Sequence, residues 1–311
     1  MNMNIIAISL NPAIDVTLWI DTVEFEEPIF PYKEKLYAGG KAVNVSRVLT
    51  KLGNDNILLT LAGLGNLESF SELLVADGVD FEIIPVKGTT RENLTICLKD
   101  GRFIKINRDG IAAAENEFNK MLDSIQRKVD NNKQNCLVFS GEAPYNITTE
   151  VLTEYILKVK EKRPDDYIVL DNSTITLEQV KKIKPFLFKP NRLEFEDMFC
   201  TADMTDDVLM ENIKILSDYV THLIVSLGKD GMLYAHDGKI HRITVPSVEK
   251  GTSVGAGDTT VACFIDAISR TNDPLYAVKY AAAGGTASVM LDGTDTVTFE
   301  NIQKIMKGMV I

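Results

Sequence analysis

The stretch 252–260 combines two glycines, a carboxylate and the start of an apolar helical run. Gly255, Ala256 and Gly257 leave backbone N–H groups bare at a predicted helix start, where the helix dipole adds partial positive charge. Such a corner can hold an anion, and Asp258 beside it can take a proton from a hydroxyl while a phosphoryl group is held in place. The alternative is a glycine-containing loop in which Asp258 is an ordinary helix cap.

A second glycine-rich helix start lies near the N-terminus. Gly39 and Gly40 precede a predicted helix, and Lys41 and Asn44 share one face of its first turn. Ammonium, amide and bare backbone together suit a polyhydroxy ligand that carries a phosphate. The alternative is a helix start with a solvated lysine. Arg91 can grip a substrate phosphate through two guanidinium nitrogens, or it can lie solvated at a sheet edge.

A third segment follows a predicted strand that ends at Lys189. Asn191 can cap the next helix, with Glu194 at the capping-box position, and that function would be purely structural. Both side chains can instead face a magnesium ion, directly or through water, because magnesium takes few carboxylates and keeps several waters. No Walker A loop or complete dinucleotide fingerprint occurs, so a bound ATP would lie late in the chain, near 189–260.

A fourth segment ends the strand-like run 221–227 with a glycine-containing turn. Ser226, Gly228 and Gly231 lie in or beside this turn. Ligands of α/β folds bind at such strand ends. A plain tight turn is the alternative.

The elements that must position these residues alternate along the chain. Short apolar runs, mostly β-branched, predict buried parallel strands at 4–10, 56–62, 136–140, 167–171, 186–188 and 221–227. Periodic runs predict helices at 41–52, 66–77, 114–130, 147–162, 191–199, 205–219, 257–270, 274–291 and 300–308. This alternation predicts an α/β fold of three layers around a mainly parallel central sheet.

Two inserts break the alternation. Residues 14–37 contain prolines and no helix signal, and residues 93–107 are typical of a hairpin with Asp-Gly in its turn. We expect the two inserts to form a small antiparallel sheet over the active face, where it would act as a lid or a dimer surface. A second hairpin, around 236–239, is expected at an edge of the core.

Bulk composition excludes several classes of protein. The length of 311 residues fits one large domain or two modest ones, and the net charge of −11 argues against nucleic acid or an anionic membrane as a partner. No apolar run approaches a membrane span, and the start of the chain does not resemble a signal peptide. Four scattered cysteines and three histidines predict neither a disulfide framework nor a zinc site. We expect a cytoplasmic protein.

In this order, the segments resemble the PfkB (ribokinase-like) carbohydrate kinase family over essentially the whole chain. The most specific motifs are Gly39-Gly40-Lys41 with Asn44, and Gly255-Ala256-Gly257-Asp258. Leu10-Asn11-Pro12-Ala13-Ile14-Asp15 and Ser253-Val254 resemble the phosphohexose kinase branch of that family. The resemblance implies a single ribokinase-like domain, 1–311, whose inserts at about 12–38 and 89–108 form a β lid and often a homodimer interface.

The resemblance also implies functions for individual residues. Asp258 would be the base, and residues 255–257 would form the anion hole for the transferring phosphoryl group. The phosphosugar would lie among polar groups and glycines from the first half of the chain: Asp15, Gly39, Gly40, Lys41, Asn44, Arg91, Asn93 and Asn107. ATP would lie among residues from the second half: Lys189, Asn191, Ser226, Gly228, Gly231 and Thr252. Glu194, with Asn191, would organise Mg2+.

The leading hypothesis is an ATP-dependent kinase acting on the free primary hydroxyl of a ketohexose monophosphate, either fructose 1-phosphate or tagatose 6-phosphate. The same chemistry on an unphosphorylated sugar or nucleoside is one alternative, against which Lys41 and Arg91 argue. A non-catalytic nucleotide or sugar-phosphate sensor is another. Glu142 and the segment 171–174 depart from the family pattern. Glu142 would add negative charge beside a phosphosugar, bind a sugar hydroxyl, or point away.

Overall fold

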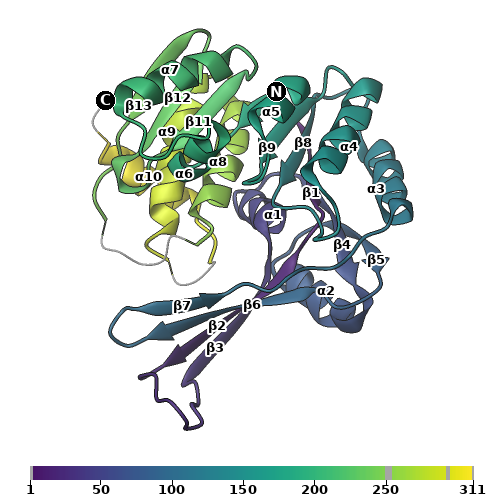
Figure 1. Ribbon diagram of the computed structural model, residues 1–311, viewed down its shortest axis with the longest axis vertical. Coiled ribbons are helices and arrows are strands. Elements are labelled where there is room, and N and C mark those ends of the chain that lie inside the picture. The colour runs from purple at the N-terminus through teal and green to yellow at the C-terminus, as the bar shows by residue number, and fades with distance from the viewer. Residues whose placement is uncertain (1–2, 249–253, 292–294, 310–311) are drawn as a thin grey trace.

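A computed structural model of the protein describes residues 3–248, 254–291 and 295–309 (Figure 1). Within these residues, nine strands form one sheet in the order β13-β12-β11-β10-β9-β8-β1-β4-β5. The pairs from β11 to β5 are parallel, and β12 and β13 add antiparallel strands at one edge. Their bounds are β1 (Asn4–Ser9), β4 (Asn56–Gly63), β5 (Phe81–Val86), β8 (Asn135–Ser140), β9 (Tyr167–Asp171), β10 (Leu187–Phe188), β11 (His222–Ser226), β12 (Met232–His236) and β13 (Lys239–Ile243).

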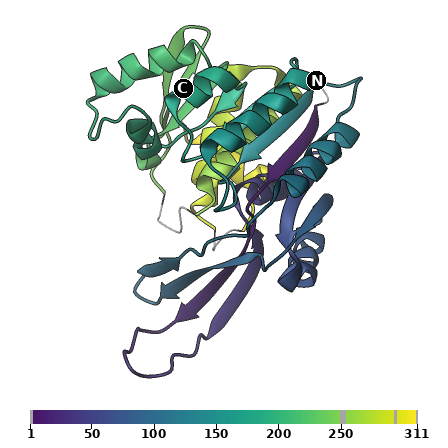
Figure 2. The same cartoon turned by 45° about the vertical axis from the view of Figure 1, so that its right-hand side comes forward.

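Helices cover both faces of this sheet (Figures 1 and 2). They are α1 (Lys41–Lys51), α2 (Leu67–Ala76), α3 (Glu115–Lys128), α4 (Thr149–Lys162), α5 (Leu177–Ile183), α6 (Arg192–Met198), α7 (Asp206–Ser217), α8 (Ala256–Thr271), α9 (Pro274–Ser288) and α10 (Phe299–Lys307). Successive residues of a strand point to opposite faces. Ile6 therefore packs with the cluster of α3, α4, α5, α6 and α7, and Ile5 with that of α1, α8, α9 and α10.

The predicted three-layer α/β fold is therefore confirmed, and so is the predicted edge hairpin, which is β12 and β13. Two elements were missed. β5 contains Pro85 and lies at the sheet edge, where a missing N–H is tolerated but weakens the strand signal. α5 has only seven residues, too few to show a helical period.

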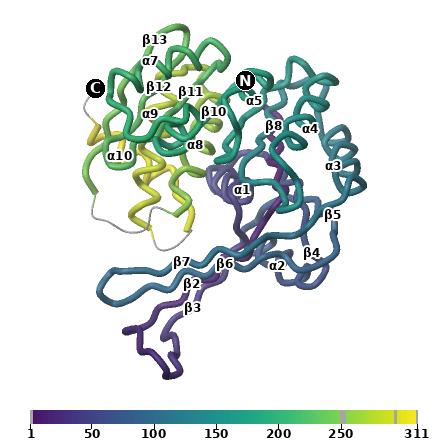
Figure 3. Tube along the Cα trace, viewed as in Figure 1, coloured from purple at the N-terminus to yellow at the C-terminus, as the bar shows by residue number. Residues whose placement is uncertain are grey.

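The two inserts form a separate four-stranded sheet, the lid. Its strands are β2 (Ala13–Ile20), β3 (Lys33–Gly39), β6 (Arg91–Leu98) and β7 (Phe103–Ile106), in the order β3-β2-β6-β7. The expected antiparallel sheet is wrong for the central pair, because β2 and β6 run parallel. Both strands enter the lid from parallel core strands, β1 and β5, and so leave the core in the same direction (Figure 3). The lid lies where the parallel strands end and projects away from the core.

None of the helices in the described residues combines the length and the apolar character that a bilayer crossing requires.

Candidate active site

The two glycine-rich helix starts predicted from the sequence meet in the structure. Gly40 precedes α1 with φ of 101°, and Gly255 precedes α8 with φ of 77°. These left-handed conformations favour glycine. The Nδ2 atom of Asn44 donates to Oδ2 of Asp258 across 2.8 Å. Asp258 lies inside the first turn of α8, and Gly255, at the N-cap, has no side chain to bind the free N–H groups.

Asp258 is buried, with 7% of its surface exposed. Burial, together with the negative charge of Asp171, raises the pKa of this carboxyl to about 6. The hydrogen bond from Asn44 and two nearby lysine charges act in the opposite direction. The carboxylate is therefore ionised at neutral pH and still basic enough to accept a proton.

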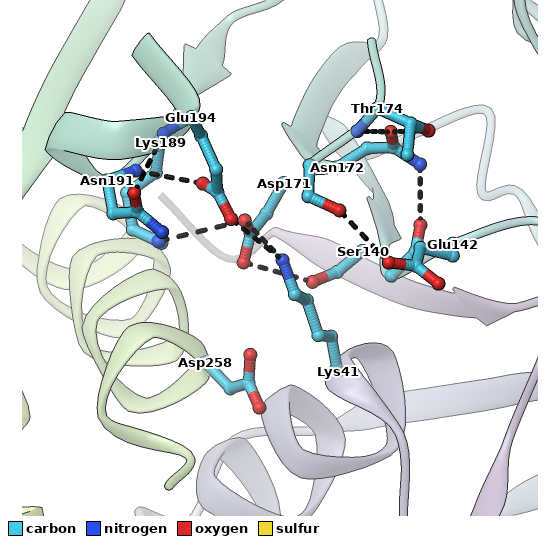
Figure 4. A network of polar contacts seen from close by, with 12 residues as sticks. Lys41, Ser140, Glu142, Asp171, Asn172, Thr174, Lys189, Asn191, Glu194 and Asp258 are labelled. Atoms are coloured by element: carbon cyan, nitrogen blue, oxygen red, sulfur yellow. Dashed lines mark hydrogen bonds and ion pairs between the residues drawn. The ribbon is translucent and has the colours of Figure 1, made fainter. Parts of the chain in front are cut away.

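A buried carboxylate next to this corner holds two lysines (Figure 4). Oδ1 of Asp171 lies 3.3 Å from Nζ of Lys41 and 3.7 Å from Nζ of Lys189. Its other oxygen accepts a hydrogen bond from Ser140 at 3.4 Å. Burial favours the neutral acid, but the charges of Lys189 and Lys41 outweigh it, so the pKa of Asp171 lies below its usual value. Three ionised side chains are thus collected within reach of the bare end of α8.

Lys189 also contacts the glycine corner directly. A Cβ atom at position 257 would lie 3.1 Å from its ammonium nitrogen, so Gly257 leaves room for that group. The N-terminus of α8 and this lysine together make a positively polarised pocket wall beside Asp258.

In the sequence, Asp171 stands out only as part of a segment that departs from the family pattern. One signal would have found it: it is the last residue of the buried strand β9, at the edge where α/β folds bind ligands.

The capping box predicted at Asn191 and Glu194 is present. Oδ1 of Asn191 accepts from the backbone N–H of Glu194 at 2.9 Å, and Oε2 of Glu194 accepts from the backbone N–H of Asn191 at 2.9 Å. The second carboxylate oxygen, Oε1, faces Lys41 at 3.9 Å. Glu194 therefore caps α6 with one oxygen and directs the other toward the Asp171 network.

The lid contributes a second polar group. Asp15 and Asn93 are register partners in the parallel pair β2–β6, and Nδ2 of Asn93 donates to Oδ1 of Asp15 at 2.9 Å. A Cβ atom at Gly39 would lie 2.2 Å from Asp15 Oδ2, so only glycine fits beneath this carboxylate. The guanidinium of Arg91 donates to the backbone carbonyls of Asn11 and Arg108, both at 3.3 Å.

Unpartnered buried polar atoms gather in this region. Within the described residues, five buried side-chain nitrogen or oxygen atoms have no hydrogen-bond partner. Three of them are Oδ1 of Asn11, Oδ1 of Asn44 and Nε of Arg91. Buried polar groups are normally satisfied, so a concentration of exceptions indicates where a polar ligand binds.

The family model for pfkB family carbohydrate kinases matches residues 6–300. The chain belongs to this family. It is 27% identical over 306 residues to a 1-phosphofructokinase of Borreliella burgdorferi, covering 97% of this chain and 96% of the relative. It is 26% identical over 315 residues to a tagatose-6-phosphate kinase of Staphylococcus epidermidis, covering 99% of both.

A solved structure of phosphofructokinase-2 from Escherichia coli, in complex with fructose-6-phosphate, superimposes with a TM-score of 0.89. The two chains are 22% identical, and the match covers 99% of each. At this identity the likeness concerns the fold, and it confirms the ribokinase-like architecture expected from the sequence.

Not every residue expected from the pfkB resemblance joins the central network. Asn107 lies just after β7 with an exposed side chain. Ser226 ends β11 and pairs with Asn191 through an isolated bridge, which places it beside the capping box. Gly228 begins a short 3-10 turn (Gly228–Asp230), and a Cβ atom at Gly231 would lie 2.0 Å from a carbonyl oxygen of β13. Thr252 lies outside the described residues.

Glu142 and the 171–174 segment, which depart from the pfkB pattern, contact each other. Glu142 is exposed and accepts a hydrogen bond from Ser173 Oγ at 3.1 Å, and Nδ2 of Asn172 donates to the carbonyl of Gly141 at 2.8 Å. Figure 4 shows Glu142 beside the 171–174 segment rather than among the lysines. The carboxylate therefore joins the loops after β8 and β9.

Proposed function

We propose that this pfkB-family chain transfers the γ-phosphoryl group of ATP to the free primary hydroxyl of a ketohexose monophosphate, giving a bisphosphate. The observation that carries the proposal is the buried Asp258 beside a bare helix N-terminus and two lysines. The relatives named 1-phosphofructokinase and tagatose-6-phosphate kinase, which match over nearly the whole chain, support the substrate class.

In this proposal Asp258 is the catalytic base. It orients the acceptor hydroxyl and takes its proton as the new P–O bond forms, while Asn44 fixes the carboxylate. Gly255, Ala256 and Gly257 present backbone N–H groups to the transferring phosphoryl oxygens, where negative charge must be neutralised.

We divide the cationic side chains between two phosphate groups: the one being transferred and the one that the sugar already carries. Lys189 and Lys41 share the Asp171 network, so we assign both to the phosphoryl group in transfer, whereas the family resemblance alone implies that Lys41 faces the phosphate already on the sugar. Arg91 lies at the base of the lid, and we assign it to the phosphate that the sugar already carries. Asp15, Asn93 and the glycines at 39 and 40 would contact the sugar hydroxyls, with Asn107 nearby.

We extend the same division to ATP and Mg2+. We propose that ATP lies along Lys189, Asn191, Ser226, Gly228 and Gly231, and that Thr252 completes this site. Oε1 of Glu194 is the carboxylate oxygen left over from the capping box, which fits an ion that takes few carboxylates. Bound there with Asn191, directly or through water, Mg2+ would neutralise phosphate charge.

The lid supplies a surface for a second copy of the chain. It exposes several large apolar side chains, among them Phe25 (87% exposed), Phe30 (85%), Tyr32, Leu36, Phe103, Ile104 and Ile106. We propose a single kinase domain over 1–311 that forms a homodimer through this face. Light scattering after size exclusion would test the dimer, because Phe30→Ser with Phe103→Ser should give a monomer.

We also propose that the protein is cytoplasmic, because ATP and sugar phosphates are supplied there.

A panel of acceptors tests the proposed reaction. Fructose 1-phosphate, tagatose 6-phosphate, fructose 6-phosphate, ribose and adenosine would each be offered with ATP and Mg2+, and ADP release measured. We expect the highest kcat/KM with one of the first two. A preference for ribose or adenosine would establish the alternative of a neutral acceptor, and no transfer to any acceptor would contradict kinase activity.

A further inference from the structure

Four chain crossings join the lid to the core (Figure 3), and the first of them, at Asn11 and Pro12, contacts the other three. The first crossing, 10–12, leads from β1 to β2, and the second, 39–40, returns from β3 to α1. The third, 87–91, enters β6, and the fourth, 107–111, leaves β7. A hinge or a fixed joint between lid and core must lie where these crossings touch.

Each of the other crossings touches the first one. A Cβ atom at Gly40 would lie 3.1 Å from Pro12 Cα and 3.5 Å from the carbonyl oxygen of Asn11. In the third crossing, Nη2 of Arg91 donates to that same carbonyl oxygen at 3.3 Å. A Cβ atom at Gly110, in the fourth, would lie 1.7 Å from Oδ1 of Asn11. The fourth crossing therefore lies directly on the carboxamide of Asn11.

The side chain of Asn11 is 8% exposed and is held from the core side. Its Nδ2 atom donates to the carbonyl oxygen of Ala143 at 3.3 Å, in the loop after β8. Its Oδ1 atom accepts no hydrogen bond from the described residues. The carboxamide is thus a spacer between the core loop and the fourth crossing.

Within the part of the chain that the structure describes, the side chain of Arg91 hydrogen-bonds only to the crossings. Its guanidinium donates to the backbone carbonyls of Asn11 and Arg108, and within the described residues it forms no ion pair and leaves Nε unpartnered. A carbonyl oxygen carries only partial charge, whereas a phosphate oxygen forms the stronger charge-assisted bond. The two carbonyls therefore set where this guanidinium lies without neutralising it.

We propose that Asn11 is a positioning residue for phosphate recognition, because its carboxamide and carbonyl fix the two crossings that hold Arg91. This inference rests on the proposed function, in which Arg91 binds the phosphate of the sugar. A smaller side chain at position 11 leaves space into which the fourth crossing, 107–111, can move. That movement shifts the backbone carbonyl of Arg108 and so displaces the guanidinium of Arg91. The Asp258 corner and the ATP groups are not part of the joint.

The test is steady-state kinetics of Asn11→Ala with the preferred phosphosugar. We expect KM for the phosphosugar to rise by about 10- to 100-fold, the size of a lost charge-assisted hydrogen-bond pair. KM for ATP should not change. Preference for the phosphorylated over the unphosphorylated sugar should fall by the same factor. Equal changes in KM for both substrates would indicate a merely structural residue and overturn the inference.

Asn135→Ala is a matched control. Asn135 is also buried and fixes a loop, through two hydrogen bonds with the backbone of Asp130 at 2.8 and 3.0 Å, but it begins β8, at the opposite end of that strand from the site. The thermal unfolding temperature should fall by a similar amount in both variants, whereas only Asn11→Ala should raise KM for the phosphosugar. Asn11→Asp keeps the shape and replaces the amide donor with a carboxylate near Arg91. It should weaken phosphosugar binding in the same direction if Asn11→Ala does not fold.

A compensating pair tests the contact itself. Gly110→Ala places a methyl group into the Asn11 carboxamide, so it should raise KM for the phosphosugar more than Asn11→Ala does. The double variant should return KM to the value of Asn11→Ala alone, because the carboxamide is gone. If the fold-changes in KM of the two single variants instead multiply in the double variant, the two residues act independently and the contact is contradicted. An inactive wild type would overturn the proposed function and this inference together, whereas an active wild type with an unaffected Asn11→Ala would overturn only the inference.

Discussion

Asn44 and Asp258 join the first turns of α1 and α8 by a single hydrogen bond of 2.8 Å. The helix that begins at the proposed sugar site is thereby tied to the helix that begins at the proposed phosphoryl site. The bond also determines which oxygen of Asp258 remains open, since Oδ2 is occupied by the amide. The other oxygen, Oδ1, is the one we expect to face the acceptor hydroxyl.

Replacing Asp258 by Asn should lower kcat by roughly 10²- to 10⁴-fold, because an amide cannot accept the proton of the hydroxyl. ATP should still bind, since its groups lie elsewhere, and equilibrium dialysis would show this. Asp266→Asn is the control: it removes another buried acid of the same helix, where Asp266 binds Asn54 and Arg270. Near-normal turnover in Asp258→Asn would contradict its assignment as the base.

The same substitution should stabilise the protein above pH 6. The folded-state pKa of Asp258 is raised to about 6, above the usual 3.8, so the folded state penalises the ionised form. That penalty is absent below about pH 4, grows between the two pKa values, and is complete above about pH 6. A shift of this size corresponds to about 3 kcal/mol. Urea unfolding at pH 4.0 and 8.0 should therefore show a higher free energy of unfolding for Asp258→Asn than for wild type only at pH 8.0. An increase at both pH values would contradict the raised pKa.

Asn44→Ala should move the acidic limb of the kcat profile to higher pH. Its hydrogen bond favours the carboxylate of Asp258, so losing it raises that pKa further above 6. A profile from pH 5 to 9 measures this directly. Wild type should lose activity as the pH falls through about 6, and an unshifted limb in the variant would show that the amide does not act on the base.

Asp171→Asn should move the same limb to lower pH. The charge of Asp171 raises the pKa of Asp258, so its removal makes Asp258 more acidic. It also leaves the buried Lys189 and the nearby Lys41 without their shared counterion, which should cost about 3–5 kcal/mol of stability. Urea unfolding and the pH profile together check both effects. A shift of the limb in the same direction as Asn44→Ala would contradict the arrangement of charges.

The parts of the fold that sequence predicted are those with local causes. Buried strands show as apolar runs, and the glycines at 40 and 255 mark helix starts because their positive φ is a local requirement. The parallel pairing of β2 with β6 was not predictable locally, since it follows from where two distant segments leave the core. A hairpin signal gives no information on such a pair.

The same limit applied to the site. Asp258 and Lys41 lie in recognisable motifs, but the importance of Asp171 depends on Lys41, which is 130 positions away, and on Lys189. Glu142 illustrates the converse. Its sequence position raised the question of charge beside a phosphosugar, and only the structure showed that Ser173 binds it.

The order in which the lid strands are synthesised also constrains how the chain can fold. β2 and β3 emerge early, yet the second edge of β2 is covered only when β6 has been made. Until then a nascent chain exposes an unpaired strand that contains Val16 and Leu18, and such edges pair readily with other chains. Released fragments that end between residues 40 and 90 should therefore be aggregation-prone, whereas fragments that extend beyond residue 110 contain every lid strand.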